Sequence, residues 1–368
     1  MRKLASIQRI TNLEKIDGKD FIELASIQGW KVIVQKGEFN VGDLVIYIEY
    51  DTIIPDKPPF SSMDFLRKRC YKPGYNGFRI RNMKMGNVFS QGIVFNTSIL
   101  KSRTVYSGMN LTRTLGITRY APEEQQEQIK TRYNWFIKFI RKLFKIKKKR
   151  QVCKYPTDIP KSNEENIQNI FDDLDKNNTY IVTEKLEGQA VTYEFRHKKG
   201  LGNKDIFNVY SHNLRRPKED MSNWWKIAKK LDLKFKMSLF PQDMMIQGEI
   251  VGPGIQKNIY ALEELDFYVY GAKSLSTGIT IGHAGLESLC GAMLLNYVPI
   301  LLCNVKLMDS VEKMLELSNG QSYINPAQIR EGMVWKTDNF KANNTPIHFK
   351  VKSPKYLQWL DKKEGKCI

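Results

Sequence analysis

A block of basic residues divides this sequence and limits how the chain can fold. Residues 131–150, TRYNWFIKFIRKLFKIKKKR, end in the run KKKR. Because a packed core does not accommodate a run of charges, this block is predicted to mark a domain boundary. The chain of 368 residues is long enough for two or three domains. We therefore predict a first domain over 1–115, a basic helical linker over 116–158 and a second domain over 159–368.

The same block has the pattern of an amphipathic helix, with apolar residues on one face and basic residues on the remainder. The apolar positions are Tyr133, Phe136, Ile140, Leu143 and Phe144. Three interpretations stay open: the helix binds RNA phosphates, lies on an anionic membrane, or packs its apolar face on a domain. The most apolar run, GAMLLNYVPILLC over 291–303, is too short to cross a bilayer and is interpreted as core. A membrane is a possible partner but not the favoured one.

Charge and cysteine content narrow the setting in which the chain works. The formal net charge of +19 favours a polyanionic partner, either nucleic acid or an anionic membrane surface, over a solvated basic surface alone. The five cysteines are odd in number and none has CxxC spacing, which argues against a disulfide framework and a zinc site. The N-terminus lacks the apolar core of a signal peptide. We predict a reducing, intracellular compartment, cytoplasmic or nuclear.

Residues 1–115 have the pattern of short strands separated by turns. WKVIVQKGEFNVGDLVIYIEYDTIIP alternates β-branched and aromatic residues between turn signals, and NGFRIRNMKMGNVFSQGIVF repeats the pattern. This predicts an all-β barrel of the OB type. Arg79, Arg81 and Lys84, close to Phe78, would suit an RNA-binding surface. An ordinary amphipathic strand explains those residues equally well.

Residues 159–368 mix strands with helices, which predicts an α+β domain. Within it, the stretch TEKLEG places Lys185 between Glu184 and Glu187, followed by Gly188. A lysine amine becomes a nucleophile when desolvation or a nearby cation frees its lone pair. Alone, this short pattern is weak evidence, and a solvated lysine at the end of a strand is the default interpretation.

Later stretches supply charged groups that suit a nucleoside triphosphate. QGEIVGPGIQKNIY places Glu249 at the end of an apolar strand, before a glycine-rich turn, and REGMVWKT carries Glu331. HFKVKSPKY holds Lys350 and Lys352 two residues apart, hence on one face of a strand. Carboxylates position a divalent cation, and paired lysines stabilise charge on an α-phosphate.

Two further residues suit the base of the nucleotide. Tyr270 lies in the strand-like stretch DFYVYGAK, and Met333 is predicted to share a strand face with Glu331. An aromatic ring and a thioether can sandwich an adenine. Each feature alone has an ordinary structural explanation, but the whole set in this order favours a nucleotide site.

Together these stretches resemble motifs I, III, IIIa, IV and V of the covalent nucleotidyltransferases, the superfamily of polynucleotide ligases and mRNA capping enzymes. GEIVGPGIQKNIY is closest to RNA ligases, and residues 1–115 resemble the N-terminal OB domain of one ATP-dependent RNA ligase family. The resemblance covers most of the chain, apart from the basic block and parts of 275–325. It implies a multidomain protein, with an all-β OB-type barrel followed by an α+β nucleotidyltransferase domain, that uses ATP and Mg²⁺ or Mn²⁺.

The resemblance also implies a role for each candidate residue. Lys185 would be the nucleophile that becomes adenylated. Glu187, Glu249 and Glu331 would hold the hydrated metal ion. The other nucleotide contacts would be Glu184 at the adenine edge, Gly188 and Glu249 in the binding turn and strand, Tyr270 and Met333 beside the ring, and Lys350 and Lys352 at the α-phosphate.

The implied function is the sealing of RNA 3′-hydroxyl to 5′-phosphate ends, at nicks, through lysyl–AMP and AMP–polynucleotide intermediates. The RNA partner would be a nicked duplex or an RNA/DNA hybrid, and the enzyme a monomer. Asn166 and His212 stand where the family has arginines near the nucleotide. Two alternatives stay open: an RNA-binding protein with a decayed ligase domain, and a DNA-joining or capping-type nucleotidyltransferase.

Overall fold

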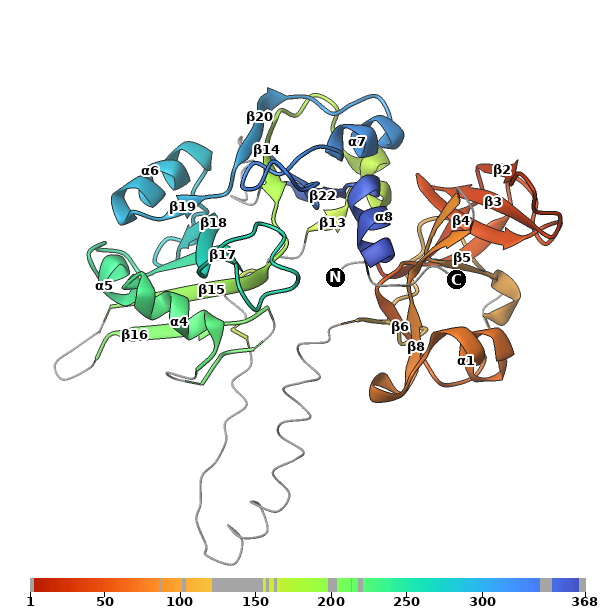
Figure 1. The fold of residues 1–368 in the computed structure, drawn as a ribbon, viewed down its shortest axis with the longest axis horizontal. Helices are drawn as coiled ribbons and strands as arrows, with labels where there is room; N and C mark the ends of the chain where they lie inside the picture. The colour runs from red at the N-terminus through yellow and green to blue at the C-terminus, as the bar shows by residue number, and fades with distance from the viewer. Residues whose placement is uncertain are drawn as a thin grey trace, which may run out of the picture. The chain divides into compact units, whose positions relative to one another are not determined.

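The computed structural model describes residues 3–85, 88–100, 104–120, 155–156, 159–161, 164–197, 204–212, 214–217, 221–337 and 346–363. Contacts divide the chain into two compact units, residues 1–150 with 358–368 and residues 151–357 (Figure 1). The predicted helix over 131–150 and most of the predicted linker lie outside the described residues. Within the described part of the chain, no helix is long and apolar enough to cross a membrane.

The first unit is built mainly from antiparallel strands. One sheet holds β1 (Ala5–Arg9), β5 (Leu44–Ile48) and β11 (Ile93–Asn96), and a second holds β2 (Asn12–Lys15), β3 (Ile22–Ile27) and β4 (Trp30–Gln35). A third sheet holds β12 (Thr118–Arg119), β6 (Thr52–Pro55), β8 (Gly77–Ile80) and β7 (Tyr71–Lys72). Strand β9 (Asn82–Met85) pairs with β10 (Val88–Gln91). The helical segments are α1 (Asp64–Cys70), η1 (Phe60–Ser62), η2 (Pro73–Tyr75) and η3 (Thr97–Ile99).

Alternation of apolar and polar residues explains how these strands close around a core. In β4, Trp30, Val32 and Val34 are buried, and the residues between them are half-exposed. Ile46 of β5 and Phe78 of β8 join one buried cluster that draws on the first and third of these sheets and on α1. The all-β character predicted for this part of the chain is therefore present in the structure.

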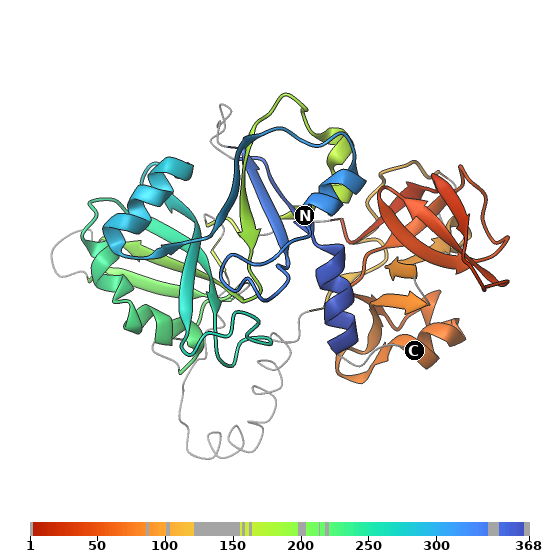
Figure 2. The ribbon, with the colours of Figure 1, turned by 45° about the horizontal axis from the view of Figure 1, so that its top comes forward.

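The second unit contains two five-stranded sheets. The first has the order β13 (Glu165–Asn166), β22 (His348–Lys352), β21 (Gly332–Thr337), β14 (Tyr180–Lys185) and β20 (Ile300–Val305). The second has the order β16 (Ile206–Tyr210), β15 (Gln189–Arg196), β17 (Met244–Val251), β18 (Asp266–Ser274) and β19 (Asn296–Tyr297). The chain crosses from the first sheet to the second in the short turn between β14 and β15 (Figure 2).

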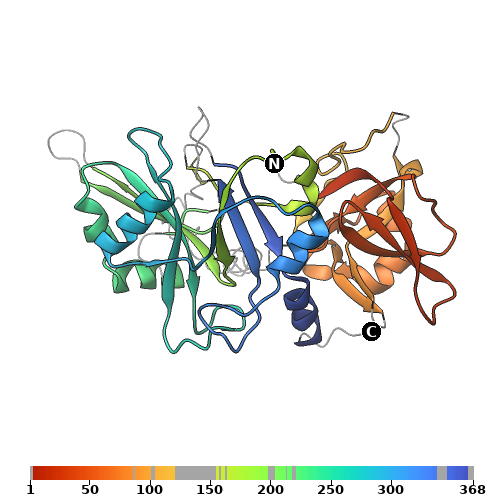
Figure 3. The same ribbon diagram turned by 90° about the horizontal axis from the view of Figure 1, so that it is seen from above.

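Helices cover one face of each sheet in the second unit (Figure 3). Helices α4 (Asn223–Lys230), α5 (Leu233–Ser238) and α6 (His283–Met293) pack against the second sheet. Helix α7 (Val311–Ser318), η4 (Ile167–Asn169) and η5 (Phe171–Asp173) pack against the first. Because side chains alternate along a strand, the opposite faces of both sheets are left for other roles. Helix α8 (Pro354–Lys363) follows β22.

Candidate active site

Lys185 is the last residue of β14, at the point where the chain leaves the first sheet. Strand β14 lies between β21 and β20, and its run YIVTEK is rich in the residues that suit a strand paired on both edges. In the ladder with β21, Lys185 lies opposite Gly332. Its side chain keeps 22% of its surface exposed, so the amine is accessible to a ligand.

Glu331 holds this amine in place. The Lys185 Nζ donates to Glu331 Oε2 at 2.7 Å, and the Lys352 Nζ lies 3.8 Å from Glu331 Oε1. Burial acts to raise the pKa of Glu331, but the ammonium groups of Lys185 and Lys352 outweigh it and lower the pKa below its usual value. Glu331 is therefore an ionised carboxylate that aligns the lysine amine.

The two lysines of β22 share the Lys185 face of the sheet. Lys352 lies opposite Gly332 and Lys350 lies opposite Val334 in the ladder between β22 and β21. Residues directly opposite one another in antiparallel strands point to the same side. The structure therefore brings Lys185, Lys350 and Lys352 together on one face.

Glu187 lies in the turn that joins the two sheets. Its backbone N–H donates to the Tyr260 hydroxyl at 2.7 Å. Burial raises the pKa of Glu187, and the negative charge of Glu331 raises it further. The Glu187 Oε2 atom is buried and has no hydrogen-bond partner. A cation bound between these two carboxylates would satisfy the free oxygen and offset their repulsion.

Gly188 allows the turn to approach β17 closely. A Cβ atom there would lie 2.4 Å from the Ile250 carbonyl oxygen and 2.7 Å from Glu249 Cγ. Any side chain would collide with both, so glycine is required for this close approach. The Glu249 side chain consequently lies against the turn that carries Glu187.

The carboxylates are better placed to bind a metal ion partly through its water molecules than to ligate the ion directly. Across the described ranges, no group of three His, Cys, Asp or Glu side chains is close enough to ligate an ion directly. Yet Glu187 is in the turn, Glu249 lies against Gly188, and Glu331 contacts Lys185. Because Mg²⁺ retains several of its waters, carboxylates at this spacing can hold it partly through water.

A half-buried lysine links the two sheets beside this site. Lys336 lies opposite Ile181 in the ladder between β21 and β14. Because side chains alternate along a strand, Ile181 and Lys185 share one face of β14, so Lys336 is on the Lys185 face of the first sheet. Its Nζ donates to the Tyr270 carbonyl oxygen of β18 at 2.5 Å and lies 5.6 Å from the Tyr270 ring centre. Burial lowers the pKa of Lys336. No local pattern in the sequence predicts this contact, since a lysine within a strand is ordinarily assigned to solvent.

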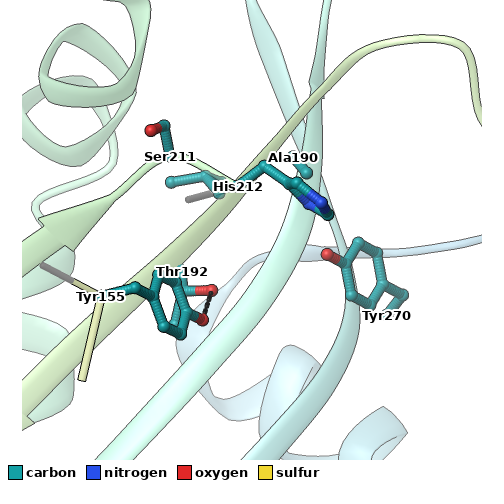
Figure 4. Close-up of a pocket in the computed structure, with 7 residues that line it drawn as sticks. Tyr155, Ala190, Thr192, Ser211, His212 and Tyr270 are labelled. Atoms are coloured by element: carbon teal, nitrogen blue, oxygen red, sulfur yellow. Dashed lines mark hydrogen bonds between the residues drawn. The ribbon is translucent and has the colours of Figure 1, made fainter. Parts of the chain in front are cut away.

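Tyr270 also borders a small polar pocket on the second sheet, together with Tyr155, Thr192, Ser211 and His212 (Figure 4). The His212 ring points toward Tyr270, and the Tyr155 hydroxyl lies 3.1 Å from Thr192 Oγ1. His212 therefore borders the predicted base-stacking tyrosine. Asn166, the other departure from the family pattern, is buried and lies beside Lys350 in the ladder between β13 and β22.

The structure contradicts the predicted role of Met333. This side chain is 2% exposed and packs in the core with Trp335 and Phe349, on the face of β21 away from Lys185. Val334 is half-exposed and lies on the Lys185 face. The error arose because Glu331 precedes β21, which begins at Gly332, so its side chain does not define a face of the strand.

Glu184 is buried beside the segment that precedes β21. Its Oε2 accepts from the Tyr323 backbone N–H at 2.8 Å, and its Oε1 is buried without a hydrogen-bond partner. Burial raises the pKa of Glu184. Burial and Asp266 raise the pKa of Tyr268, and the charge of Glu184 adds to this rise. Glu184 is therefore close to β18. The free oxygen is an acceptor that a donor group on a ligand could occupy.

The predicted RNA-binding residues lie in the first unit. Arg79 is engaged by its own domain: its Nη2 donates to Asp51 at 3.0 Å, and its guanidinium lies 3.6 Å from the Tyr120 ring centre. Arg81, immediately before β9, and Lys84, within it, are half-buried. Sequence reasoning missed the exposed basic residues of α1, which the run LRKRC signals: Arg67, Lys68 and Arg69.

Two family models match the chain over separate ranges. A model described as RNA ligase matches residues 178–352, and one described as an OB-fold domain matches residues 4–97. No curated protein matches the sequence at a significant level. These ranges correspond to the nucleotidyltransferase and OB-type domains that the motifs predict, which confirms the predicted fold class.

Solved structures of one enzyme resemble the whole chain. The Naegleria gruberi RNA ligase with PPi has 25% sequence identity and a TM-score of 0.77, over 98% of this chain and 100% of that chain. A variant of it with ATP and Mn has 26% identity and a TM-score of 0.77, over 97% and 99%. An apo variant has 25% identity and a TM-score of 0.79, over 98% and 99%. The chain therefore belongs to the family of ATP-dependent RNA ligases that carry an N-terminal OB domain.

Proposed function

We propose that this ligase seals RNA 3′-hydroxyl to 5′-phosphate ends at nicks, through a lysyl–AMP intermediate formed on Lys185. One observation carries the proposal: an accessible lysine amine is fixed at 2.7 Å on a buried carboxylate, with Lys350 and Lys352 on the same sheet face. A structural ion pair would not require two further lysines beside it. This arrangement is suited to an attack on a phosphate.

In the first step, the Lys185 amine attacks the α-phosphorus of ATP after losing a proton. A P–N bond forms, the bond to the β-phosphate breaks, and pyrophosphate leaves. Lys350 and Lys352 would neutralise the α-phosphate, and Glu331 would keep the amine aligned. A divalent cation held by Glu187 and Glu249 would reduce the negative charge on the triphosphate.

The next two steps move AMP from the enzyme to the RNA and then release it. An oxygen of the RNA 5′-phosphate attacks the phosphorus of lysyl–AMP, the P–N bond breaks, and Lys185 regains its proton. The RNA 3′-hydroxyl then attacks the activated 5′-phosphate, a phosphodiester forms, and AMP leaves. Since the same face of the first sheet would serve each step, catalysis depends mainly on positioning and charge.

The base would lie between Val334 and Tyr270, with Glu184 at its edge. The unpaired Glu184 Oε1 would accept from the 6-amino group of adenine, whereas the 6-carbonyl of guanine would repel it. This supports ATP as the nucleotide.

The test is incubation of the protein with α-labelled ATP and Mn²⁺ or Mg²⁺, followed by denaturing electrophoresis. We expect acid-labile label on the protein, and transfer of that label to a nicked duplex whose 3′-hydroxyl strand is RNA. Label from GTP alone would indicate a capping-type enzyme, and equal sealing of DNA 3′-ends a DNA-joining one. Folded protein that takes label from no triphosphate would support a decayed ligase domain.

Replacement of Glu184 by glutamine is expected to lower the preference for ATP over GTP about tenfold, because the amide can donate to the guanine carbonyl. The glutamine oxygen would still accept from the Tyr323 N–H. The measurement is kcat/KM for label transfer from each triphosphate, with Glu263→Gln, an exposed carboxylate on the loop before β18, as the matched control. An unchanged ATP to GTP ratio would remove Glu184 from base recognition.

We propose that the OB domain contacts RNA phosphates through Arg81 and Lys84. Replacing either by alanine is expected to weaken binding of a nicked duplex and to reduce the slope of log Kd against log salt by about one. Arg79→Ala should change the slope less, since Asp51 and Tyr120 already engage that guanidinium. Titrations at several salt concentrations measure this. Equal slopes for wild type and all three variants would place the phosphate contacts elsewhere.

A further inference from the structure

Two buried tyrosine hydroxyls converge on Glu187 from distant parts of the sequence. Tyr260 follows the glycine-rich loop after β17 and is 4% exposed. Tyr356 lies in the first turn of α8 and is 2% exposed. The Glu187 N–H donates to the Tyr260 hydroxyl oxygen at 2.7 Å, and the Tyr356 hydroxyl donates to the Glu187 carboxylate. The main chain and the side chain of Glu187 are thus each held by a separate tyrosine.

The hydrogen bonding of this carboxylate is uneven. The Tyr356 hydroxyl bonds the group, yet Oε2 is buried with no hydrogen-bond partner. A buried carboxylate oxygen without a donor is costly unless a ligand satisfies it. Fixing one side of the carboxylate therefore presents Oε2 in a defined direction.

The start of α8 is itself anchored to the main chain of Glu331, whose side chain is the other carboxylate of the site. The Ser353 N–H donates to the Glu331 carbonyl oxygen at 2.9 Å, and Ser353 Oγ accepts from the Tyr356 N–H at 3.1 Å. Ser353 Oγ also donates to Asn319 Oδ1 at 2.8 Å. These bonds fix the position of Tyr356 relative to the main chain of Glu331. Its place beside Glu187 is therefore set by the same residues that place Glu331.

We propose that Tyr356 is a positioning residue, whose hydroxyl orients the Glu187 carboxylate so that Oε2 is presented to the divalent cation that accompanies ATP. Tyr260 holds the main chain of the same turn. Without the Tyr356 hydroxyl, Glu187 rotates about its side-chain bonds, and ordering it on the cation costs affinity. Partners of this kind alter metal affinity by about 10- to 100-fold when removed. The inference rests on the proposed function.

The test is Tyr356→Phe, which removes the hydroxyl and keeps the ring. We expect the Mn²⁺ concentration for half-maximal lysyl–AMP formation to rise about 10- to 100-fold, with the rate at saturating Mn²⁺ near that of wild type. The second measurement needs no catalysis: the Mn²⁺ concentration that raises the melting temperature should shift by the same factor. Tyr323→Phe is the matched control, because that side chain is 68% exposed and only its backbone bonds a site residue.

Two results would overturn this inference. One is a Tyr356→Phe enzyme with the metal dependence of wild type in both measurements. The other is a rate reduced equally at every Mn²⁺ concentration with an unshifted melting profile, which would assign the hydroxyl to packing or chemistry. A wild-type protein that forms no lysyl–AMP would instead refute the proposed function. In that case the melting profiles alone decide whether Tyr356 orients Glu187.

Discussion

Replacement of Lys185 by alanine is expected to abolish lysyl–AMP formation and to reduce the sealing of 5′-phosphate RNA by about a thousandfold or more. Glu331 aligns the Lys185 amine at 2.7 Å at the end of β14, whereas Lys350 and Lys352 start from β22, so their amines do not occupy the same position. The measurement is label transfer from α-labelled ATP together with single-turnover sealing of a nicked duplex.

The control for this variant is a substrate that already carries AMP on its 5′-phosphate. Lys185→Ala should still join that RNA, since the last step does not use the lysine as a nucleophile. RNA affinity should be unchanged, because the OB domain is untouched. Lys226→Ala, an exposed lysine on α4, should match wild type in every assay. Retention of sealing with ATP and ordinary 5′-phosphate ends would refute the assignment of Lys185.

Replacement of Glu331 by glutamine is expected to impair both catalysis and stability. The change removes the ionised partner of Lys185 and Lys352, whose Nζ atoms lie 2.7 and 3.8 Å from its oxygens. Breaking a buried ion pair by removing one partner costs about 3 kcal/mol of unfolding free energy. We also expect lysyl–AMP formation to fall about a hundredfold. Denaturant unfolding and label transfer measure the two effects.

The lowered pKa of Glu331 predicts how the stability difference between wild type and Glu331→Gln changes with pH. The pKa of Glu331 is lowered in the folded protein, so its contribution to stability is fully present above the unfolded pKa, roughly 4.3, and is lost as the pH falls through the folded value. The stability difference between wild type and Glu331→Gln should therefore be large at pH 7 and shrink in acid. A difference that is constant with pH would mean that packing, rather than charge, is lost.

Glu187→Gln is the matched control for Glu331→Gln. Burial and the charge of Glu331 raise the pKa of Glu187, so its contribution is favourable below the unfolded pKa and is lost as the pH rises through the folded value. In metal-free buffer at pH 7, Glu187→Gln should be at least as stable as wild type, although activity falls. Equal destabilisation by both substitutions would contradict the different charge states assigned to the two carboxylates.

The motif spacing predicted which residues would meet, but it did not predict the direction of every side chain. Lys185 and Lys352 end the strands β14 and β22, and Glu331 immediately precedes β21, which lies between them, so antiparallel pairing brings the three residues together. The prediction for Met333 was wrong because a shift of one residue in the start of a strand exchanges its two faces, and the sequence does not mark that start. Val334 is the residue that the structure places on the Lys185 face.

Other features depend on contacts that no local pattern reveals. Lys336 bonds a carbonyl group in the other sheet, and Arg79 bonds Asp51, which precedes the neighbouring strand β6 of its own domain. Tyr356 occurs in the stretch SPKYLQW, which predicts the start of a helix and nothing more. Such partners are set by the tertiary fold, so charge and burial in the structure were needed to find them.

The order of the strands also has a consequence during protein synthesis. Strand β14 lies between β21 and β20, and the partner of its terminal lysine is 146 residues further along the chain. A chain leaving the ribosome exposes Lys185 long before Glu331 or Tyr356 has been translated, and pairing over such separations is slow to form. The nascent protein therefore carries the proposed nucleophile before it has the carboxylate that would align it. The proposed adenylation becomes possible only once Glu331 and β22 have been synthesised and have paired with β14 and β21.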